Sequence, residues 1–190
     1  MSDLEDFSSS TLLSRPDLHE ATEGEFKGWR TWTFDPFLNH TGPFWHRVEA
    51  ERKVRCAFRV QKKHLNGAGI VHGGCFLVFV DYCVFAIAGL ILDSPGVTVS
   101  LSSDFLSTAR EGELIEATGE VTRAGGSLIF VRGELKTGER ILLTFSGTLK
   151  RLKQKIRAKS NPESLGSERY PSSAHQDRAH GRRQDAAARL

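Results

Sequence analysis

The chain has 190 residues, of which 39% are hydrophobic and 26% are charged, and a formal net charge of +3. These values are typical of a globular protein with one domain of ordinary size, and they exclude a fibrous or wholly disordered chain. The charge is uneven, because residues 151–190 hold ten Lys and Arg against four Asp and Glu, whereas the rest is mildly acidic. A basic tail on an acidic domain does not predict a nucleic-acid binder.

Both ends of the chain have compositions that cannot form a core. The start, MSDLEDFSSS, is acidic and polar and has no secretory signal pattern, so we expect a flexible segment at 1–25. Residues 154–190 are rich in Ser, Gly, His and Arg, which predicts a basic, disordered tail. One domain remains at 26–153. Three widely spaced cysteines without a C-x-x-C pair indicate reduced thiols, and we expect a cytoplasmic protein.

Strand signals dominate the predicted domain. The segment at 29–34 is aromatic-rich, and two proline turns and a short strand follow it. Residues 53–60 alternate strictly, with Val54, Cys56, Phe58 and Val60 on one face, as in a half-buried strand. Four more strand-like runs follow at 97–106, 113–123, 127–136 and 140–152. Gly-containing connections between them favour antiparallel hairpins.

Residues 73–93 differ from all of these, because they are apolar on every side over about 20 positions. The length reaches that of a membrane-spanning helix. Asp81 would then lie near the middle of the bilayer, at a cost of roughly 2.5–3.5 kcal/mol. A helix wrapped by a sheet is apolar all round for a different reason, and the strands on both sides favour this buried helix. We therefore expect no membrane insertion.

A glycine-rich loop leads into this helix. It runs from His64 to Gly74 and contains Asn66, followed by His72-Gly73-Gly74 at the helix start. Uncovered N–H groups at a helix start can stabilise a carbonyl oxygen that becomes negatively charged. Gly-rich helix starts are common, however, and are usually structural, so the loop alone is a weak signal.

Asp81 is the one ionisable residue inside the apolar helix. Burying it is costly unless it is hydrogen-bonded or used, and a carboxylate satisfied by a neighbouring hydroxyl or amide is the simpler interpretation. A buried carboxylate can also act as general base or attack a thioester directly. Gly73 and Asp81 are eight residues apart, roughly 12 Å along a helix. If both are catalytic, two antiparallel copies of the helix must form the site, which predicts a symmetric dimer.

The pattern H-x-N-x-x-G-x-x-H-G-G, with Asp nine residues after the second His, resembles the PaaI-like (4-hydroxybenzoyl-CoA thioesterase-related) branch of the hotdog-fold thioesterases. The resemblance covers roughly residues 40–150, including GPF at 42–44, GVTVSLSSDFL at 96–106 and REGE at 110–113. It implies an α+β hotdog fold, with a long central helix wrapped by a curved antiparallel sheet of five or six strands. It also implies homodimers, often paired into homotetramers, and no metal.

The resemblance also implies roles for individual residues. Asp81 would be nucleophile or general base, the Gly73 N–H would polarise the thioester carbonyl, and Asn66, His72 and Thr98 would assist. Further substrate contacts are expected at His64, Gly74, Arg123 and Ser127. Arg123 and Ser127 flank a hairpin near which relatives meet the CoA phosphates, although a solvated hairpin tip explains them equally well.

The predicted function is therefore hydrolysis of an acyl-CoA with a short, medium-chain or aryl acyl group, CoA being substrate and not cofactor. The alternative is a hotdog dimer that binds an acyl-CoA or acyl-carrier thioester without turnover. A hydratase motif and a G-x-S-x-G elbow are both missing from the sequence, and the spacing of His64 and His72 does not suit a metal. Two departures are Thr108, where relatives often have Pro, and Tyr82, which we expect to narrow the acyl pocket.

Overall fold

The computed structural model describes residues 13, 18–50 and 53–152. Eight strands, two α-helices and a short 3-10 turn follow one another along this part of the chain. In order they are β1 (Leu18–Glu20), β2 (Arg30–Trp32), α1 (Pro36–Thr41), β3 (Trp45–Val48), β4 (Val54–Arg59), the turn Lys62–His64, α2 (Gly73–Ala88), β5 (Gly96–Phe105), β6 (Leu114–Ala124), β7 (Leu128–Thr137) and β8 (Arg140–Arg151).

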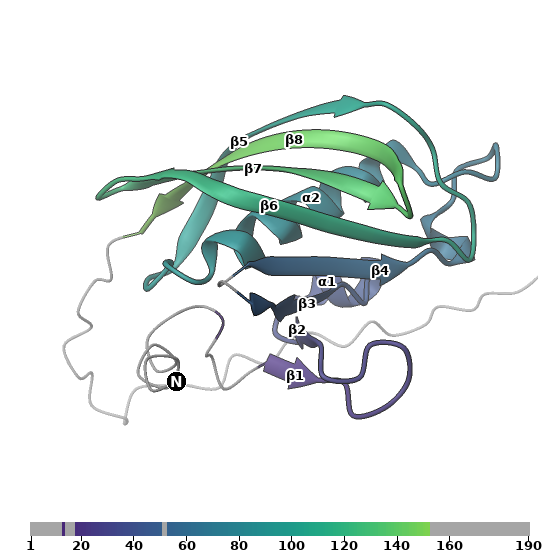
Figure 1. Ribbon diagram of the computed structural model, residues 1–190, viewed down its shortest axis with the longest axis horizontal. Coiled ribbons are helices and arrows are strands. Elements are labelled where there is room, and N and C mark those ends of the chain that lie inside the picture. The colour runs from purple at the N-terminus through teal and green to yellow at the C-terminus, as the bar shows by residue number, and fades with distance from the viewer. Residues whose placement is uncertain (1–12, 14–17, 51–52, 153–190) are drawn as a thin grey trace, which may run out of the picture. The chain divides into compact units, whose positions relative to one another are not determined.

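The strands form one antiparallel sheet in the order β1-β2-β3-β4-β6-β7-β8-β5. Helix α2 packs against five of them, β4 to β8, and Figure 1 shows it behind β6 and β7, which curve across it. This is the predicted hotdog arrangement. The sheet has eight strands instead of five or six, because β1 and β2, of three residues each, extend it beyond β3.

The core lies between α2 and the sheet. Val54, Cys56 and Phe58 of β4 are at most 3% exposed, which confirms the face predicted from their alternation. Nine residues of α2 are buried. Of the seven residues that are not buried, four share one side of the helix at intervals of four, namely Gly73, Leu77, Asp81 and Phe85. Helix α2 is therefore enclosed on all sides but one, and is not buried all round as the sequence suggested.

Two boundaries differ from the sequence predictions. Helix α2 ends at Ala88 instead of residue 93. Gly89 caps the helix, and the Ile91 and Leu92 amides both donate hydrogen bonds to the Ala88 carbonyl. The first predicted proline turn is helix α1. Pro36 occupies its first position, and the Asp35 carboxylate accepts hydrogen bonds from the Phe37 and Leu38 amides. An Asp-Pro pair suits a helix start, and this signal was present in the sequence.

The N-terminal segment contributes to the core, although residues 1–25 were expected to stand outside it. Leu13 and Ala21 are buried, and β1 pairs with β2. Leu13 lies against Gly89, where an added Cβ would meet the Leu13 side chain at 2.8 Å. Isolated hydrophobic residues within a polar stretch of sequence can therefore belong to the core. The expected tail at 154–190 lies outside the described residues.

Candidate active site

The loop before α2 is folded by Asn66 and Gly69. The Asn66 side-chain oxygen accepts hydrogen bonds from the Ala68 and Ile70 amides, at 2.9 and 3.4 Å. Gly69 has φ +73°, a conformation that residues with a Cβ rarely adopt. The Asn66 side chain thus fixes the loop through its oxygen, and its NH₂ group has no acceptor in the described part of the chain.

His72 is the N-cap of α2. Its Nδ1 accepts a hydrogen bond from the Gly74 amide at 2.9 Å, and its carbonyl accepts from the Cys75 and Phe76 amides. Of the first four amides of the helix, the Gly73 N–H alone has no acceptor among the described residues. A helix start leaves such donors with a partial positive charge, which suits a carbonyl oxygen becoming an oxyanion.

Asp81 is half-buried on the open side of α2. Thr98 of β5 donates a hydrogen bond from its hydroxyl to one Asp81 carboxylate oxygen at 2.6 Å. Burial raises the pKa of the Asp81 carboxyl, the Thr98 hydrogen bond lowers it, and the nearby Asp35 charge raises it. A carboxylate with a raised pKa and a second oxygen available is a better proton acceptor than an ordinary aspartate.

One protomer brings Asp81 and Thr98 together but keeps the Gly73 amide away from them. Gly73 and Asp81 are eight positions apart, which corresponds to roughly 12 Å of helix. A base and an oxyanion donor must both lie about 3 Å from the reacting group. Gly73 and Asp81 do lie on the same open side of the helix, where a second molecule can reach both.

His64 is placed as a structural residue. It is 4% exposed, its Nδ1 accepts a hydrogen bond from the Gln61 amide at 3.0 Å, and its Nε2 donates to the Thr41 carbonyl at 2.8 Å. Burial lowers its pKa, with an opposing contribution from the bond to Thr41 and a further lowering by the Lys63 charge. The predicted substrate contact of His64 stays a prediction, and its contacts within the chain favour a role in holding the loop.

The other predicted substrate contacts lie apart from Asp81. The Gly74 amide is already bonded to His72, so it is a poor second donor. Arg123 and Ser127 are exposed at the hairpin between β6 and β7. Arg123, on β6, lies three strand spacings from β5, roughly 14 Å, and Ser127, next to β7, lies two spacings from it, roughly 10 Å. The predicted substrate contacts of these two residues stay predictions.

Three of the four aromatic residues of α2 belong to the core, and the fourth, Phe85, is half-buried on the open side of the helix. Phe76, Phe79 and Tyr82 are at most 2% exposed and pack within the core of their own protomer. The Tyr82 hydroxyl lies 2.6 Å from Nδ1 of His46, in a buried contact that also includes Trp32. Tyr82 therefore faces the core, and the expectation that it narrows the acyl pocket stays a prediction. Sequence reasoning missed His46, which carries no motif.

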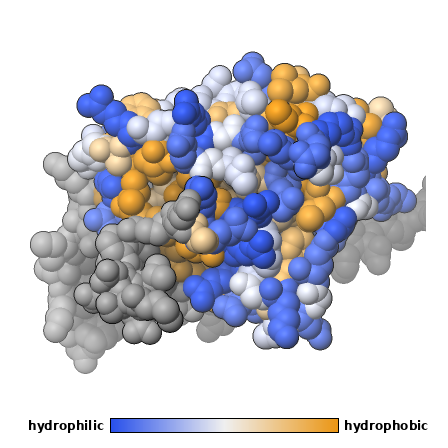
Figure 2. All heavy atoms as spheres, viewed as in Figure 1, coloured by the Kyte–Doolittle hydropathy of each residue, from blue (hydrophilic) through white to orange (hydrophobic). Residues whose placement is uncertain are grey.

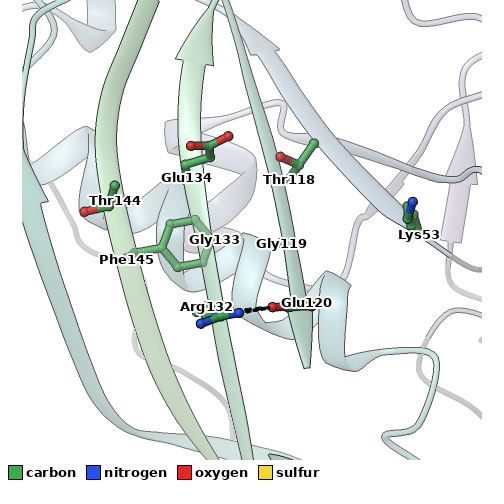
Figure 3. Close-up of a pocket in the computed structure, with 9 residues that line it drawn as sticks. All are labelled: Lys53, Thr118, Gly119, Glu120, Arg132, Gly133, Glu134, Thr144 and Phe145. Atoms are coloured by element: carbon green, nitrogen blue, oxygen red, sulfur yellow. Dashed lines mark hydrogen bonds and ion pairs between the residues drawn. The ribbon is translucent and has the colours of Figure 1, made fainter. Parts of the chain in front are cut away.

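An open groove lies elsewhere, over β6, β7 and β8 (Figure 3). Thr118 and Glu120 line it, and they face away from α2, because the intervening Gly119 faces Ile87 of that helix. An ion pair between Glu120 and Arg132 crosses it. Figure 2 shows this surface as hydrophilic side chains interrupted by hydrophobic patches. None of the predicted site residues lines the groove.

The cysteines do not supply a reactive nucleophile. Cys56 and Cys83 are buried free thiols, and Cys75 is half-buried. Burial raises the pKa of the Cys75 thiol to about 11, so it is not an activated nucleophile. In the described part of the chain, no three His, Cys, Asp or Glu side chains gather as metal ligands. Among the described helices, none is long and apolar enough to cross a membrane.

Comparison with known proteins identifies the family that the chain resembles. The family model described as Thioesterase superfamily matches residues 68–144. "Putative esterase PA0474" of Pseudomonas aeruginosa is 35% identical over 114 residues, which are 59% of this chain and 85% of that protein. Human Acyl-coenzyme A thioesterase 13 is 33% identical over 87 residues, which are 45% of this chain and 62% of that protein.

A solved structure shows the same fold. It is a mutant form of the phenylacetic acid degradation protein PaaI from Thermus thermophilus, with a TM-score of 0.55 and 24% identity. The match covers 62% of this chain and 100% of the solved chain. On the family model and the 35% identical relative, the chain belongs to the thioesterase superfamily, which confirms the predicted thioester hydrolase family, and the solved structure confirms the fold.

Proposed function

We propose that this chain is an acyl-CoA thioesterase that works as a homodimer with two shared sites. The observation that carries the proposal is the open side of α2, which holds one amide without an acceptor among the described residues, at Gly73, and one half-buried carboxylate, at Asp81. The similarity to human Acyl-coenzyme A thioesterase 13 supports acyl-CoA as the substrate.

In the proposed reaction, Asp81 acts as general base. Thr98 holds one oxygen of its carboxylate, and the other removes a proton from water. The water oxygen bonds to the thioester carbonyl carbon, and the Gly73 N–H of the other protomer stabilises the carbonyl oxygen as it gains negative charge. The C–S bond then breaks, the carboxylic acid is released, and the CoA thiolate takes up the proton.

Direct attack by Asp81 on the thioester is the competing route. A single turnover in ¹⁸O-labelled water distinguishes the two. If water attacks directly, the first acid released carries one labelled oxygen. If Asp81 attacks, CoA leaves and a mixed anhydride forms between the acyl group and Asp81. When water then opens the anhydride at the Asp81 carbon, the first acid carries oxygen from the enzyme and the label appears in the Asp81 carboxylate, so label in Asp81 is evidence for direct attack.

Symmetry specifies how the two helices meet. If Gly73 of one protomer lies opposite Asp81 of its partner, a two-fold axis must pass through the midpoint, which is Leu77. Leu77 is 39% exposed on the open side of the helix, between Gly73 and Asp81. An exposed leucine on the open side of α2 suits a contact between two copies of the helix. Edge strand β5 also exposes Val97 and Val99, at 43% and 56%, on the face opposite to Thr98.

The decisive experiment measures thiol release from a panel of acyl-CoAs by the wild type and by Asp81→Asn. We expect turnover in the wild type and its collapse in the variant, with an unchanged melting temperature. Binding of acyl-CoA without thiol release by the wild type would instead support the non-catalytic binding protein. Equal rates in both proteins would remove Asp81 from the mechanism.

Shared sites have a test of their own. Gly73→Pro removes only the N–H, since Pro suits the first position of a helix, His72 is already extended (ψ 133°), and the nearest atom to a new Cβ is 3.6 Å away. Gly73→Pro and Asp81→Asn should each be inactive alone. Refolded together, half of the dimers contain one intact site, so about a quarter of wild-type activity should return. A mixture that stays inactive contradicts shared sites.

A cysteine at the proposed axis gives independent evidence. Leu77→Cys should form a disulfide-linked dimer under mild oxidation, seen on a non-reducing gel. Thr118→Cys is the matched control, because its side chain is exposed on the opposite face of the sheet. Equal cross-linking of both variants, or of the wild type with its own three thiols, would argue against an axis at Leu77.

A further inference from the structure

Strand β5 borders the open side of α2 beside both polar groups of the proposed site. Its last residue, Phe105, has a ring carbon 3.6 Å from the point where a Cβ on Gly73 would lie. Near the other end of the strand, the Thr98 hydroxyl lies 2.6 Å from the Asp81 carboxylate. The order of these contacts is reversed between helix and strand, so β5 runs antiparallel to α2. One strand therefore carries a side chain to each of the two polar groups.

A bulge in β5 places Thr98 and Phe105 on the same face of the sheet. Side chains alternate along a strand, so an even-numbered and an odd-numbered residue normally point to opposite faces. The register against β8 shifts between Thr98 and Ser100, which inserts one extra residue and brings both side chains to the face of α2. Bulges are common beside active sites, where they redirect side chains. Without this one, either Thr98 would lose its contact with Asp81 or Phe105 would turn away from Gly73.

Phe105 is exposed although it lies on the helix side of the sheet. Its register partner on β8, Leu143, is fully buried, whereas Phe105 is 51% exposed. One side of the ring lies toward the core, where the centroid of the buried Phe76 ring is 6.3 Å away. The rest of the ring is uncovered within one protomer, beside the Gly73 amide. Exposed aromatic surface next to a donor for a carbonyl oxygen is available to the apolar part of a ligand.

We propose that Phe105 selects the acyl group, because its ring covers the chain beyond the thioester carbonyl. This inference rests on the proposed thioesterase function, in which the Gly73 amide binds the carbonyl oxygen. It names the substrate class, which is acyl groups with an apolar chain or an aromatic ring. The acyl chain is the apolar part of an acyl-CoA, whereas the pantetheine arm carries amides and favours polar contacts. An acetyl group has a single carbon beyond its carbonyl and covers little of the ring.

The first test compares acyl-CoAs in Phe105→Ala and Phe105→Leu. Each buried CH₂ contributes roughly fourfold to binding, so the loss of about two such contacts in Phe105→Ala should lower kcat/KM for octanoyl-CoA or phenylacetyl-CoA about tenfold relative to acetyl-CoA. Phe105→Leu keeps much of the apolar surface and should lose less. Phe130→Ala is the matched control, because Phe130 is 37% exposed on β7 between the buried Ile129 and Val131, and thus points away from α2. It should leave the ratio unchanged.

Two results of this comparison would overturn the proposal. A uniform loss of kcat/KM over all acyl groups in Phe105→Ala would show that the ring contacts the CoA arm or shapes the site for every substrate. Elution of Phe105→Ala as a monomer in gel filtration at the assay concentration would show that the ring holds the dimer together.

Mixed dimers test which protomer supplies the ring. A dimer of Gly73→Pro with Asp81→Asn has one intact site, whose Gly73 comes from the Asp81→Asn protomer. Phe105 lies beside Gly73 of its own chain, so Phe105→Ala should lower the octanoyl-to-acetyl ratio when it is added to the Asp81→Asn protomer. Added to the Gly73→Pro protomer, the same substitution should leave the ratio at the wild-type value. The reverse pattern would contradict the selection by Phe105.

Binding separates a failure of this proposal from a failure of the proposed function. Dissociation constants for non-hydrolysable S-octyl-CoA and S-ethyl-CoA thioethers are measured in Asp81→Asn, with and without Phe105→Ala. If the wild type releases no thiol but Phe105→Ala abolishes the preference for the octyl group, the function fails and the selection by Phe105 stands. If thiol release is normal and the preference persists in Phe105→Ala, the selection by Phe105 fails alone.

Discussion

Two adjacent residues of α2, Asp81 and Tyr82, have opposite surroundings. Asp81 faces the open side, is half-buried and is hydrogen-bonded to one hydroxyl. Tyr82 faces the sheet, is 2% exposed and is paired with the buried His46. Both carry polar groups that burial perturbs. The Tyr82–His46 pair on the sheet side is closed to solvent. The Asp81–Thr98 pair on the open side leaves the second carboxylate oxygen of Asp81 available.

We therefore expect the sheet side of α2 to contribute to the stability of the fold and the open side to carry the proposed chemistry. Substitutions on the sheet side should change the free energy of unfolding and leave turnover nearly intact. Substitutions on the open side should do the reverse.

The largest expected effect is that of Asp81→Asn. A general base contributes about 10²- to 10⁴-fold to the rate, so kcat/KM for the best acyl-CoA should fall by that factor. The melting temperature should stay the same or rise, because the half-buried charge is removed. A large loss of stability together with activity would place Asp81 among the structural residues and break the comparison.

The second effect concerns acid stability. Burial, reinforced by the Arg30 charge, lowers the pKa of His46 from 6.5 to about 3. As the pH falls through 6.5, His46 of the unfolded chain takes up a proton, whereas His46 of the folded chain stays neutral until the pH approaches 3. The stability from neutral His46 is complete above pH 6.5 and is lost as the pH falls toward 3, by at most about 5 kcal/mol.

Two substitutions sharpen that prediction. Denaturant unfolding between pH 4 and 7 should show a shallower loss of stability in His46→Phe than in the wild type. Tyr82→Phe keeps the titrating ring, so the slope should persist, while the loss of the buried hydrogen bond lowers stability by about 1–3 kcal/mol. Identical slopes in all three proteins would show that other groups control acid unfolding.

The smallest effect is expected for Thr98→Val. The Thr98 hydrogen bond lowers the pKa of Asp81, so its removal should raise that pKa further. The acid limb of the pH profile of kcat/KM should then move to higher pH, with a loss of up to about tenfold at low pH. Thr98→Ser keeps the hydroxyl and should retain the wild-type profile. A shift in Thr98→Ser as large as in Thr98→Val would contradict this role.

The fold and much of the site could be predicted from local patterns. Alternation in β4 identified its buried face, and the apolar run at 73–93 with Gly73 and Asp81 identified the helix and its polar groups. These signals lie within short stretches of sequence, where periodicity and spacing are read directly.

The remaining features depend on contacts between distant segments. The His46–Tyr82 pair joins positions 36 residues apart, and α1 is held by a loop more than 20 residues away. Such pairs leave no periodic signal. The Asp35-Pro36 helix start, in contrast, is a local signal that was readable from the sequence.

The position of strand β5 at the edge of the sheet affects how readily the protein aggregates. Within the described part of the chain it pairs with β8 alone, so its other edge offers unpaired backbone groups beside exposed valines. Unpaired apolar edges template aggregation. Dilution, or a substitution that weakens the proposed dimer contact, should therefore cause aggregation in addition to the loss of the shared sites. Each separated chain would present the unpaired apolar edge of β5. Light scattering during storage at low concentration would record this loss as growing particles, well before the helix and sheet unfold.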